Sequence, residues 1–324
     1  MKTVFRYFLY TAALIAVLVS VFLFYIKTQL PNVGPAPDIS VEATPERIDR
    51  GHYLANHVML CMDCHAERDW SLFSAPPKPG TLGAGGDVFD QTMGFPGRFV
   101  ARNITPAGIG DWTDGEIYRA ITTGVSRDGH AFFPVMPYLL YGQLDDEDIF
   151  SVIAYIRSLE PVYNDLEESS PDFPMSLILN TIPKKGSPSV RPPKTDVLAY
   201  GQYMATASGC IECHTNYVGG KQVGAPFAGG REFSFPDGSL LRTSNITPHP
   251  TGIGLWSRDM FVQRFKVYAD SAYVPHQVEP GEFQTIMPWM MYAGMEEQDL
   301  EAIYVYLKSL DPVENPIERF TKAP

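Results

Sequence analysis

Cysteine is scarce in this sequence, with 4 residues in 324, which is too few for a disulfide-stapled scaffold of this length. Positive charge is also in short supply, because 25 Lys and Arg face 37 Asp and Glu and the formal net charge is −12. An acidic surface repels phosphate backbones, so nucleic acid is excluded as a partner. Charged residues make up 19% and hydrophobic residues 45%, an ordinary globular composition that excludes wholesale disorder and a polytopic membrane protein.

One long apolar run is present near the N-terminus. Residues 7–26 carry no charge and are long enough to cross a hydrocarbon core, so they predict a transmembrane helix. Lys2 and Arg6 precede the run, which predicts a cytoplasmic tail at residues 1–6 and export of the chain after about residue 30. A cleaved signal peptide is the alternative, but the end of the run offers no small-residue cleavage site. Residues 27–43 contain three prolines and predict an extended tether.

The chain repeats itself with a shift of roughly 150 residues, as expected of two tandem domains. Short motifs recur in the same order, and chance does not account for so many ordered matches. The matched segments are residues 51–55 with 201–205, 61–65 with 210–214, 84–86 with 228–230, 103–106 with 245–248, 108–112 with 252–256, and 136–137 with 287–288. We therefore expect domains at residues 44–160 and 195–324.

Helical patterns dominate both copies and predict a mainly α fold. Each copy ends in an apolar stripe at helical spacing, from Ile149 to Leu159 and from Leu300 to Leu310. Thr44 before a proline predicts the start of a helix that runs to about Val58. The other expected helix starts are a capping box formed by Thr113 and Glu116 and a cap at Ser257. No strand pattern of comparable length competes with these helices.

Residues 161–194 are rich in proline and predict a linker between the two copies. The apolar island at residues 175–182 is expected to pack against one of the domains, because exposed Leu and Ile would be a liability. The linker should therefore be partly fixed.

The cysteines occur in two Cys-x-x-Cys-His motifs, which are Cys61, Cys64 and His65, and Cys210, Cys213 and His214. Two thiols one helical turn apart can both add to the vinyl groups of one haem, and the next His projects toward the iron. A zinc site or a redox dithiol is the alternative. Export, duplication and the use of every cysteine favour two covalently attached haem c groups, with His65 and His214 as proximal iron ligands.

Met136 and Met287 are the predicted sixth ligands of the two irons. They occupy matched positions, and each is followed by a proline and an aromatic residue. A thioether opposite an imidazole favours ferrous iron and suits an electron carrier. Core packing is the alternative for any methionine, and Met290, Met291 and Met295 compete in the second copy alone.

The remaining candidates are weaker. His52, His57, His130, His249 and His276 lack partners at matched positions and are expected to be structural or solvated, with His130 the one competing axial ligand. Arg102 and Arg242 precede the two Asn-Ile-Thr-Pro segments and are candidates to pair with haem propionates. Trp112 and Trp256 are expected to pack in the haem pockets.

Together these motifs make the chain resemble the cytochrome c subunits of membrane-bound alcohol, aldehyde and gluconate dehydrogenases. The resemblance covers residues 44–160 and 195–312 and rests on CxxCH, Asn-Ile-Thr-Pro, Gly-Ile-Gly-x-Trp and Met-Pro followed by Tyr or Trp. It implies electron acceptance from a catalytic dehydrogenase subunit in the periplasm and transfer to the respiratory chain. The family pattern carries three haems, whereas this sequence has two CxxCH motifs and an N-terminal anchor.

The resulting prediction is a dihaem electron carrier rather than an enzyme, anchored in a bacterial inner membrane with its haem domains in the periplasm. A dehydrogenase or respiratory-complex subunit would be the electron donor, and a downstream cytochrome or oxidase the acceptor. The alternative is a peroxidase-like dihaem enzyme in which one haem keeps an open site. A haem-based redox sensor is disfavoured because only about six residues remain for a cytoplasmic side.

Overall fold

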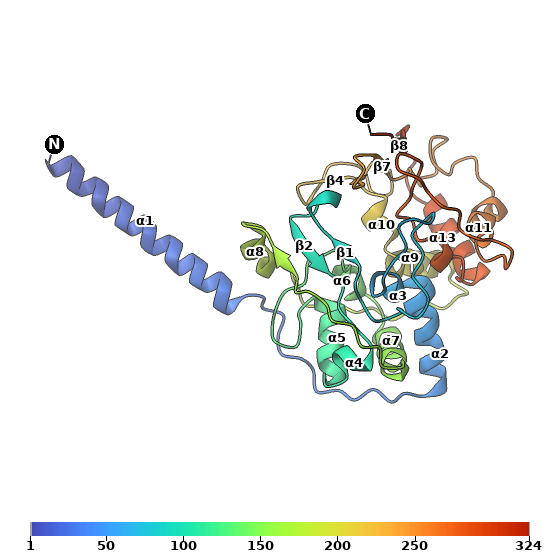
Figure 1. The fold of residues 1–324 in the computed structure, drawn as a ribbon, viewed down its shortest axis with the longest axis horizontal. Coiled ribbons are helices and arrows are strands. Elements are labelled where there is room, and N and C mark those ends of the chain that lie inside the picture. The colour runs from blue at the N-terminus through green and yellow to red at the C-terminus, as the bar shows by residue number, and fades with distance from the viewer. Residues whose placement is uncertain (1, 324) are drawn as a thin grey trace.

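The computed structural model describes residues 2–323, and its most prominent feature is the long helix α1 (Lys2–Gln29), which projects away from the rest of the chain (Figure 1). Its stretch Thr3–Gln29 is long and apolar enough to cross a membrane, and only 6% of its most apolar window is buried. The helix is longer than the predicted span at both ends, because its flanking residues also favour helix. The expected tether therefore begins after Gln29, while residues 1 and 324, at the ends of the expected tail and second domain, lie outside the described residues.

The tether after α1 runs along the surface of the first half. The backbone N–H of Val41 donates to Oδ2 of Asp114 at 2.8 Å, and Gly115 lies against the carbonyl oxygen of Pro37. These contacts fix the entry of the chain into the folded part.

Helices of the first half carry the caps that local chemistry predicts. Thr44 accepts a hydrogen bond from the N–H of Arg47 at the start of α2, and Thr113 and Glu116 form the capping box of α5. Both predictions are confirmed. The elements are α2 (Pro45–Tyr53), continued by a π-helical turn over Leu54–Val58, then α3 (Cys61–Cys64), α4 (Pro106–Ile109), α5 (Asp114–Thr123), α6 (Tyr138–Tyr141) and α7 (Asp146–Ser158).

The second half repeats this order. Its helices are α9 (Val197–Ala207), α10 (Cys210–Cys213), α11 (Arg258–Lys266), α12 (Trp289–Tyr292) and α13 (Glu297–Lys308). Ser257 caps α11 through its side chain, as predicted. In sequence order α9 corresponds to α2, α10 to α3, α11 to α5, α12 to α6 and α13 to α7.

In each half the first helix crosses the last at a glycine. A Cβ atom on Gly51 of α2 would lie 1.9 Å from the carbonyl oxygen of Ser151 in α7, and one on Gly201 of α9 would lie 2.0 Å from that of Ala302 in α13. Such distances leave no room for a side chain, so the helix backbones touch at these glycines.

Short strands lie between the helices. β1 (Val88–Phe89), β2 (Gly97–Val100) and β3 (Ser170–Pro171) form one antiparallel sheet in that order. β6 (Glu232–Ser234), β7 (Leu240–Arg242) and β8 (Phe320–Thr321) form its counterpart, and β4 (Tyr217–Val218) pairs with β5 (Lys221–Gln222) in a hairpin. Helices hold 39% of the residues, so the mainly α expectation is not confirmed. The strands were missed because two to four residues are too few to give an alternating pattern.

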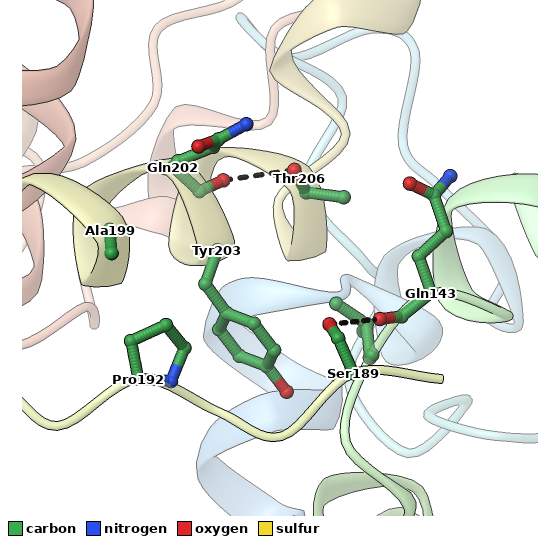
Figure 2. Close-up of a pocket in the computed structure, with 8 residues that line it drawn as sticks. Gln143, Ser189, Pro192, Ala199, Gln202, Tyr203 and Thr206 are labelled. Atoms are coloured by element: carbon green, nitrogen blue, oxygen red, sulfur yellow. Dashed lines mark hydrogen bonds between the residues drawn. The ribbon is translucent and has the colours of Figure 1, made fainter. Parts of the chain in front are cut away.

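The linker between the halves is held along its length. Ser189 donates its hydroxyl to the carbonyl oxygen of Gln143 at 2.8 Å, beside a pocket that Tyr203 and Pro192 also line (Figure 2). The apolar island is partly helical, as α8 (Met175–Ile178) and a 3₁₀ turn over Leu179–Thr181, and it packs against the end of α1, where Asn180 donates to the carbonyl oxygen of Ile26. This contact with α1 is one that the sequence did not predict.

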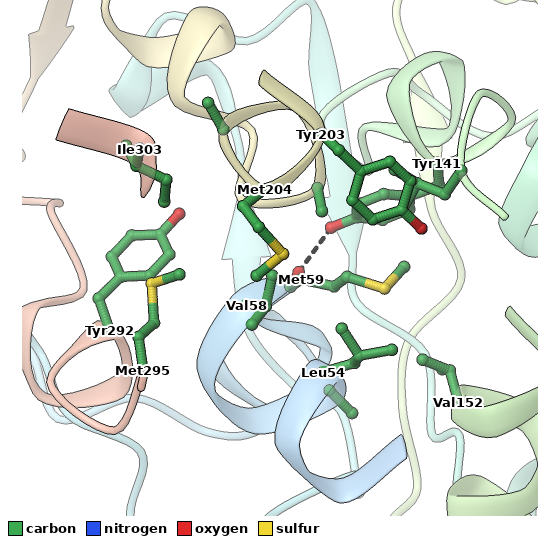
Figure 3. Packing of buried hydrophobic residues seen from close by; sticks show 14 of the residues in the cluster. Leu54, Val58, Met59, Tyr141, Val152, Tyr203, Met204, Tyr292, Met295 and Ile303 are labelled. Carbon is green, nitrogen blue, oxygen red and sulfur yellow. Dashed lines mark hydrogen bonds between the residues drawn. The ribbon is translucent and has the colours of Figure 1, made fainter. Parts of the chain in front are cut away.

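Buried apolar residues of both halves form one continuous cluster. Leu54, Val58 and Met59 of the first half face Met204 and Tyr292 of the second (Figure 3). The halves therefore share a core, although each has its own pair of crossed helices.

In each half a buried carboxylate accepts a hydrogen bond from a tyrosine of the other half. Tyr53 of the first half donates its hydroxyl to Oδ2 of Asp299 at 2.7 Å, and Tyr203 of the second half donates to Oδ2 of Asp148 at 2.7 Å. The residues of each pair occupy matched positions in the repeat. The halves consequently face each other as two similar surfaces related by a two-fold exchange of contacts.

Candidate functional site

Each Cys-x-x-Cys segment forms a single helical turn, α3 or α10, that begins from a left-handed residue. That residue is Leu60 at φ 56° in the first half and Gly209 at φ 63° in the second. The two cysteines of each turn are three residues apart, which places them on one face of the helical turn. The four cysteines are free thiols of intermediate exposure.

The two histidines that follow these turns are held in one tautomer. Nδ1 of His65 lies 2.7 Å from the carbonyl oxygen of Arg102, and Nδ1 of His214 lies 2.7 Å from that of Ser244. Since a carbonyl oxygen only accepts, Nδ1 carries the proton and Nε2 keeps its lone pair, the arrangement that orients a histidine ligand toward a metal. Burial lowers the pKa of both imidazoles, which favours the neutral form that a ligand needs.

The thiols are in their neutral form. Burial raises the pKa of Cys61 and of Cys210 to about 12, and it also raises the pKa of Cys64 and Cys213. A redox dithiol needs the opposite shift. Each pair of thiols is followed by an imidazole with a free Nε2, which is the donor set that thioether attachment of a haem requires.

The predicted distal residues, Met136 and Met287, lie in matching turns. Each is half-buried against the shared core, and each carbonyl oxygen accepts from the N–H two residues on, Tyr138 or Trp289, at 2.8 Å. Of the competing methionines, Met295 is 1% exposed and belongs to the core.

A tyrosine that the sequence reasoning missed ties each Met segment to its Cys segment. Tyr141, at the end of α6, donates its hydroxyl to the carbonyl oxygen of Met59 at 2.5 Å, and Tyr292, at the end of α12, donates to that of Ser208 at 2.5 Å. Each acceptor lies two residues before the first cysteine. The conserved spacing of an aromatic residue after each Met-Pro pair within the repeat was the signal that could have identified them.

The Asn-Ile-Thr-Pro segments hold the end of each half in place. Asn103 donates its amide to the carbonyl oxygen of Val162 at 2.7 Å, and Asn245 donates to that of Val313 at 2.8 Å. Each asparagine thereby fixes the chain just after the last helix of its half.

The weaker candidate residues of the sequence analysis make the following contacts in the structure. Arg102 donates to the carbonyl oxygen of Glu167, and Arg242 pairs with Glu232 and donates to Thr321. Both arginines thus hold the segments that return after the last helices, and the propionate role gains no support. His130 is 81% exposed beside Asp128, which agrees with a solvated histidine. Trp112 and Trp256 pack against the core.

The part of the chain from residue 2 to 323 contains no group of three or more His, Cys, Asp and Glu side chains arranged to hold a metal ion. Each half instead presents two thiols followed by an imidazole with a free Nε2. That chemistry fits a c-type haem in both halves, since the thiols supply thioether bonds and the imidazole supplies an iron ligand.

Comparison with known proteins identifies a cytochrome c domain at residues 198–311, where the family model described as cytochrome c matches the chain. The chain is 30% identical over 298 residues to the fructose dehydrogenase cytochrome subunit of Gluconobacter japonicus, an alignment that covers 86% of this chain and 56% of that subunit. It is 29% identical over 299 residues to the cytochrome c subunit of a quinone-dependent alcohol dehydrogenase of Komagataeibacter europaeus, covering 86% and 59%.

A shorter relative is matched over most of its length. The chain is 27% identical over 266 residues to a dihaem cytochrome c-type protein of Cereibacter sphaeroides, covering 78% of this chain and 83% of that protein. The chain spans less than two thirds of the dehydrogenase subunits it matches. The resemblance to cytochrome c subunits of membrane dehydrogenases is confirmed.

Proposed function

We propose that this chain is a membrane-anchored dihaem c-type cytochrome that carries electrons on the periplasmic side, between a dehydrogenase or respiratory complex and a downstream acceptor. The observation that carries the proposal is the pair of CxxCH turns in which each histidine is fixed through Nδ1 to a backbone carbonyl. The resemblance to cytochrome c subunits and to a dihaem cytochrome supports it.

The proposed organisation has two cytochrome c-like domains, at residues 44–160 and 195–324, joined by the linker at residues 161–194. The family model matches the second half alone, and support for the first half comes from its matching contacts. The histidine, tyrosine and asparagine hydrogen bonds of one half each recur in the other.

The side chains take the following roles in this proposal. Haem iron, once attached, supplies one-electron transfer by alternating between ferric and ferrous states. Cys61 and Cys64 attach the first haem, and Cys210 and Cys213 attach the second. His65 and His214 present Nε2 as proximal ligands, and Met136 and Met287 present thioethers as distal ligands, which raises the reduction potential.

An electron carrier rather than an enzyme follows if both iron sites are closed by a His and a Met. The alternative, a peroxidase-like enzyme, needs one haem with an open site. Met136 and Met287 lie in turns with the same backbone hydrogen bond, which favours two closed sites.

We assign α1 as the anchor in a bacterial inner membrane, on its length, its apolar composition and its exposure. The relatives named as subunits of fructose and alcohol dehydrogenases support a periplasmic dehydrogenase as electron donor. A downstream cytochrome or oxidase is the proposed acceptor, and the net charge of −12 favours a basic docking face on it.

The test is the optical spectrum of the purified protein, oxidised and reduced, before and after addition of carbon monoxide and peroxide. Two low-spin haems that ignore both reagents are expected. A high-spin haem that binds carbon monoxide or turns over peroxide would replace the carrier with the enzyme.

A further inference from the structure

The two halves differ at a loop formed by residues 68–76, which we call the crossing loop. It follows the first CxxCH motif, leaves the first half and runs along the second half. The backbone N–H of Phe73 donates to the carbonyl oxygen of His276 at 2.9 Å, and the carbonyl oxygen of Ser71 accepts from the N–H of Val278 at 2.9 Å. Stacking of Phe73 on His276, with ring centroids 5.0 Å apart, adds to this contact.

One end of the crossing loop reaches the Cys213 side of the second site. Trp70 packs in a small apolar cluster with Phe235 and Cys213 of the second half. The base of the loop remains bound to the first site, because Arg68 stacks on Trp70 at 4.4 Å and pairs with Asp63, which lies between Cys61 and Cys64.

The other end reaches the Met287 side. Ser74 donates its hydroxyl to the carbonyl oxygen of Met287 at 2.5 Å, and the same hydroxyl accepts from the N–H of Trp289 at 3.1 Å. Ser74 is 1% exposed. A single buried side chain thus engages the backbone on both sides of Pro288.

Hydrogen bonds with Gln284 of the second half also hold the backbone around Ser74. Gln284, which is 6% exposed, accepts at Oε1 from the N–H of Ser74 at 2.9 Å and donates from Nε2 to the carbonyl oxygen of Leu72 at 2.9 Å. Ser74 itself has a φ of 65°, a left-handed conformation that a serine adopts at a cost of about 1 kcal/mol or more and that surrounding contacts must maintain. Strain of this kind is characteristic of functional segments.

Met136 has no such support. Within residues 2–323 its backbone bonds are to Phe133 and Tyr138 of its own half. In the second half, β4 and β5 follow the CxxCH motif where the crossing loop follows it in the first, and both residues of β5 are exposed.

We propose that Ser74 is a positioning residue for Met287, so that the first half completes the distal side of the second iron site. The inference rests on the proposed function, because it takes Met287 as an iron ligand. A thioether is a neutral ligand whose bond to iron depends on where the backbone holds it, and Ser74 fixes that backbone from the opposite half. The Met287 segment then depends on a side chain of the opposite half, whereas the backbone of Met136 is bonded within its own half.

The test uses the full-length holoprotein with Ser74→Ala and Ser74→Gly. Alanine removes the hydroxyl and keeps Cβ, while glycine removes the hydroxyl and relieves the left-handed strain. Ser71→Ala is the matched control, because Ser71 lies in the same loop and its hydroxyl bonds Asp69 within the loop. The readouts are the weak far-red absorption band of a ferric iron–thioether bond, carbon monoxide binding by the reduced protein, and a redox titration.

We expect both Ser74 variants to lose the far-red band of one haem, to bind carbon monoxide at one haem and to show a lowered potential for that haem alone. Ser71→Ala should match the wild type. In a Met136→Ala background the second haem contributes the remaining band, and Ser74→Gly should remove it. In a Met287→Ala background Ser74→Gly should add nothing.

Full retention of both bands in Ser74→Gly would overturn the proposal, and so would an equal disturbance of both haems. Failure of the proposed function gives a different result, in which Met287→Ala itself leaves the wild-type spectrum unchanged.

Discussion

The first and second halves of this chain share the contacts around their CxxCH and Met segments and differ in the loops around them. In both halves a histidine donates Nδ1 to a backbone carbonyl, a tyrosine ties the Met segment to the Cys segment, and a glycine lets the first helix touch the last. The crossing loop of the first half, in contrast, lies against the second half, and the segment after the second CxxCH motif forms the β4–β5 hairpin instead. The shared contacts surround the proposed ligands in both halves, and the differing ones are the basis on which we propose that the two sites are unequal.

The largest expected effect comes from removing one attachment motif at a time. Replacing Cys61 and Cys64 by serine, or Cys210 and Cys213 by serine, should each leave one haem on the chain, because each pair forms the thioethers of one group. Haem content per protein from an alkaline pyridine spectrum measures this. Loss of both haems from either variant would mean that the two halves do not load independently.

Alanine at the crossing glycines should be the next largest change. Gly51→Ala and Gly201→Ala each force apart two helices whose backbones touch, so we expect a loss of unfolding free energy of about 3 kcal/mol. Denaturant unfolding of the holoprotein followed by circular dichroism measures both. Similar costs would support equivalent crossings, and a cost near zero at either position would contradict the close approach described here.

The reciprocal tyrosines test the boundary between the halves. Tyr53→Phe removes a hydrogen bond to Asp299, and Tyr203→Phe removes one to Asp148. A hydrogen bond to a buried charged group contributes about 1.5–3 kcal/mol, and each carboxylate keeps other partners, including Tyr200 for Asp299 and Arg50 for Asp148. We expect a loss of about 1–2 kcal/mol for each variant in thermal unfolding. A marked difference between the stability losses of the two variants would contradict the equivalence of the two tyrosine–carboxylate contacts.

Helix caps should give the smallest effects. Thr113→Ala removes the bond that its hydroxyl accepts from the N–H of Glu116 and keeps the backbone bond to the Glu116 carboxylate, and Ser257→Ala removes the one side-chain cap of α11. Similar losses of about 1 kcal/mol are therefore expected. Thermal unfolding of the two variants side by side measures the difference. A larger loss at Ser257 would show that α11 depends on its cap more than α5 does.

The features that were predictable from the sequence are those that depend on neighbouring residues. The caps at Thr44, Thr113 and Ser257, the last helices of both halves and the long apolar helix all follow from local pattern. The sheets escaped prediction because their strands are too short to alternate. The contact of the island at residues 175–182 with α1 was not predicted, since a local apolar run does not specify its partner.

The residues of the candidate site also fall into those that the sequence identified and those that it did not. The cysteines, histidines and methionines stand out because the repeat aligns them. Ser74 does not, because it contacts Met287 across 213 positions of sequence through an irregular loop that has no counterpart in the other half. Arg102 and Arg242 were weak candidates for pairing with propionates, from their place before the Asn-Ile-Thr-Pro segments, and in the structure both bond to the segments that return after the last helices.

The most direct test of the central claim is the mass of the intact purified holoprotein together with its reduced spectrum. The account predicts two covalently attached haem c groups per chain, both low-spin and both closed to carbon monoxide. A mass that corresponds to a single haem, with the first CxxCH motif unmodified, would contradict it.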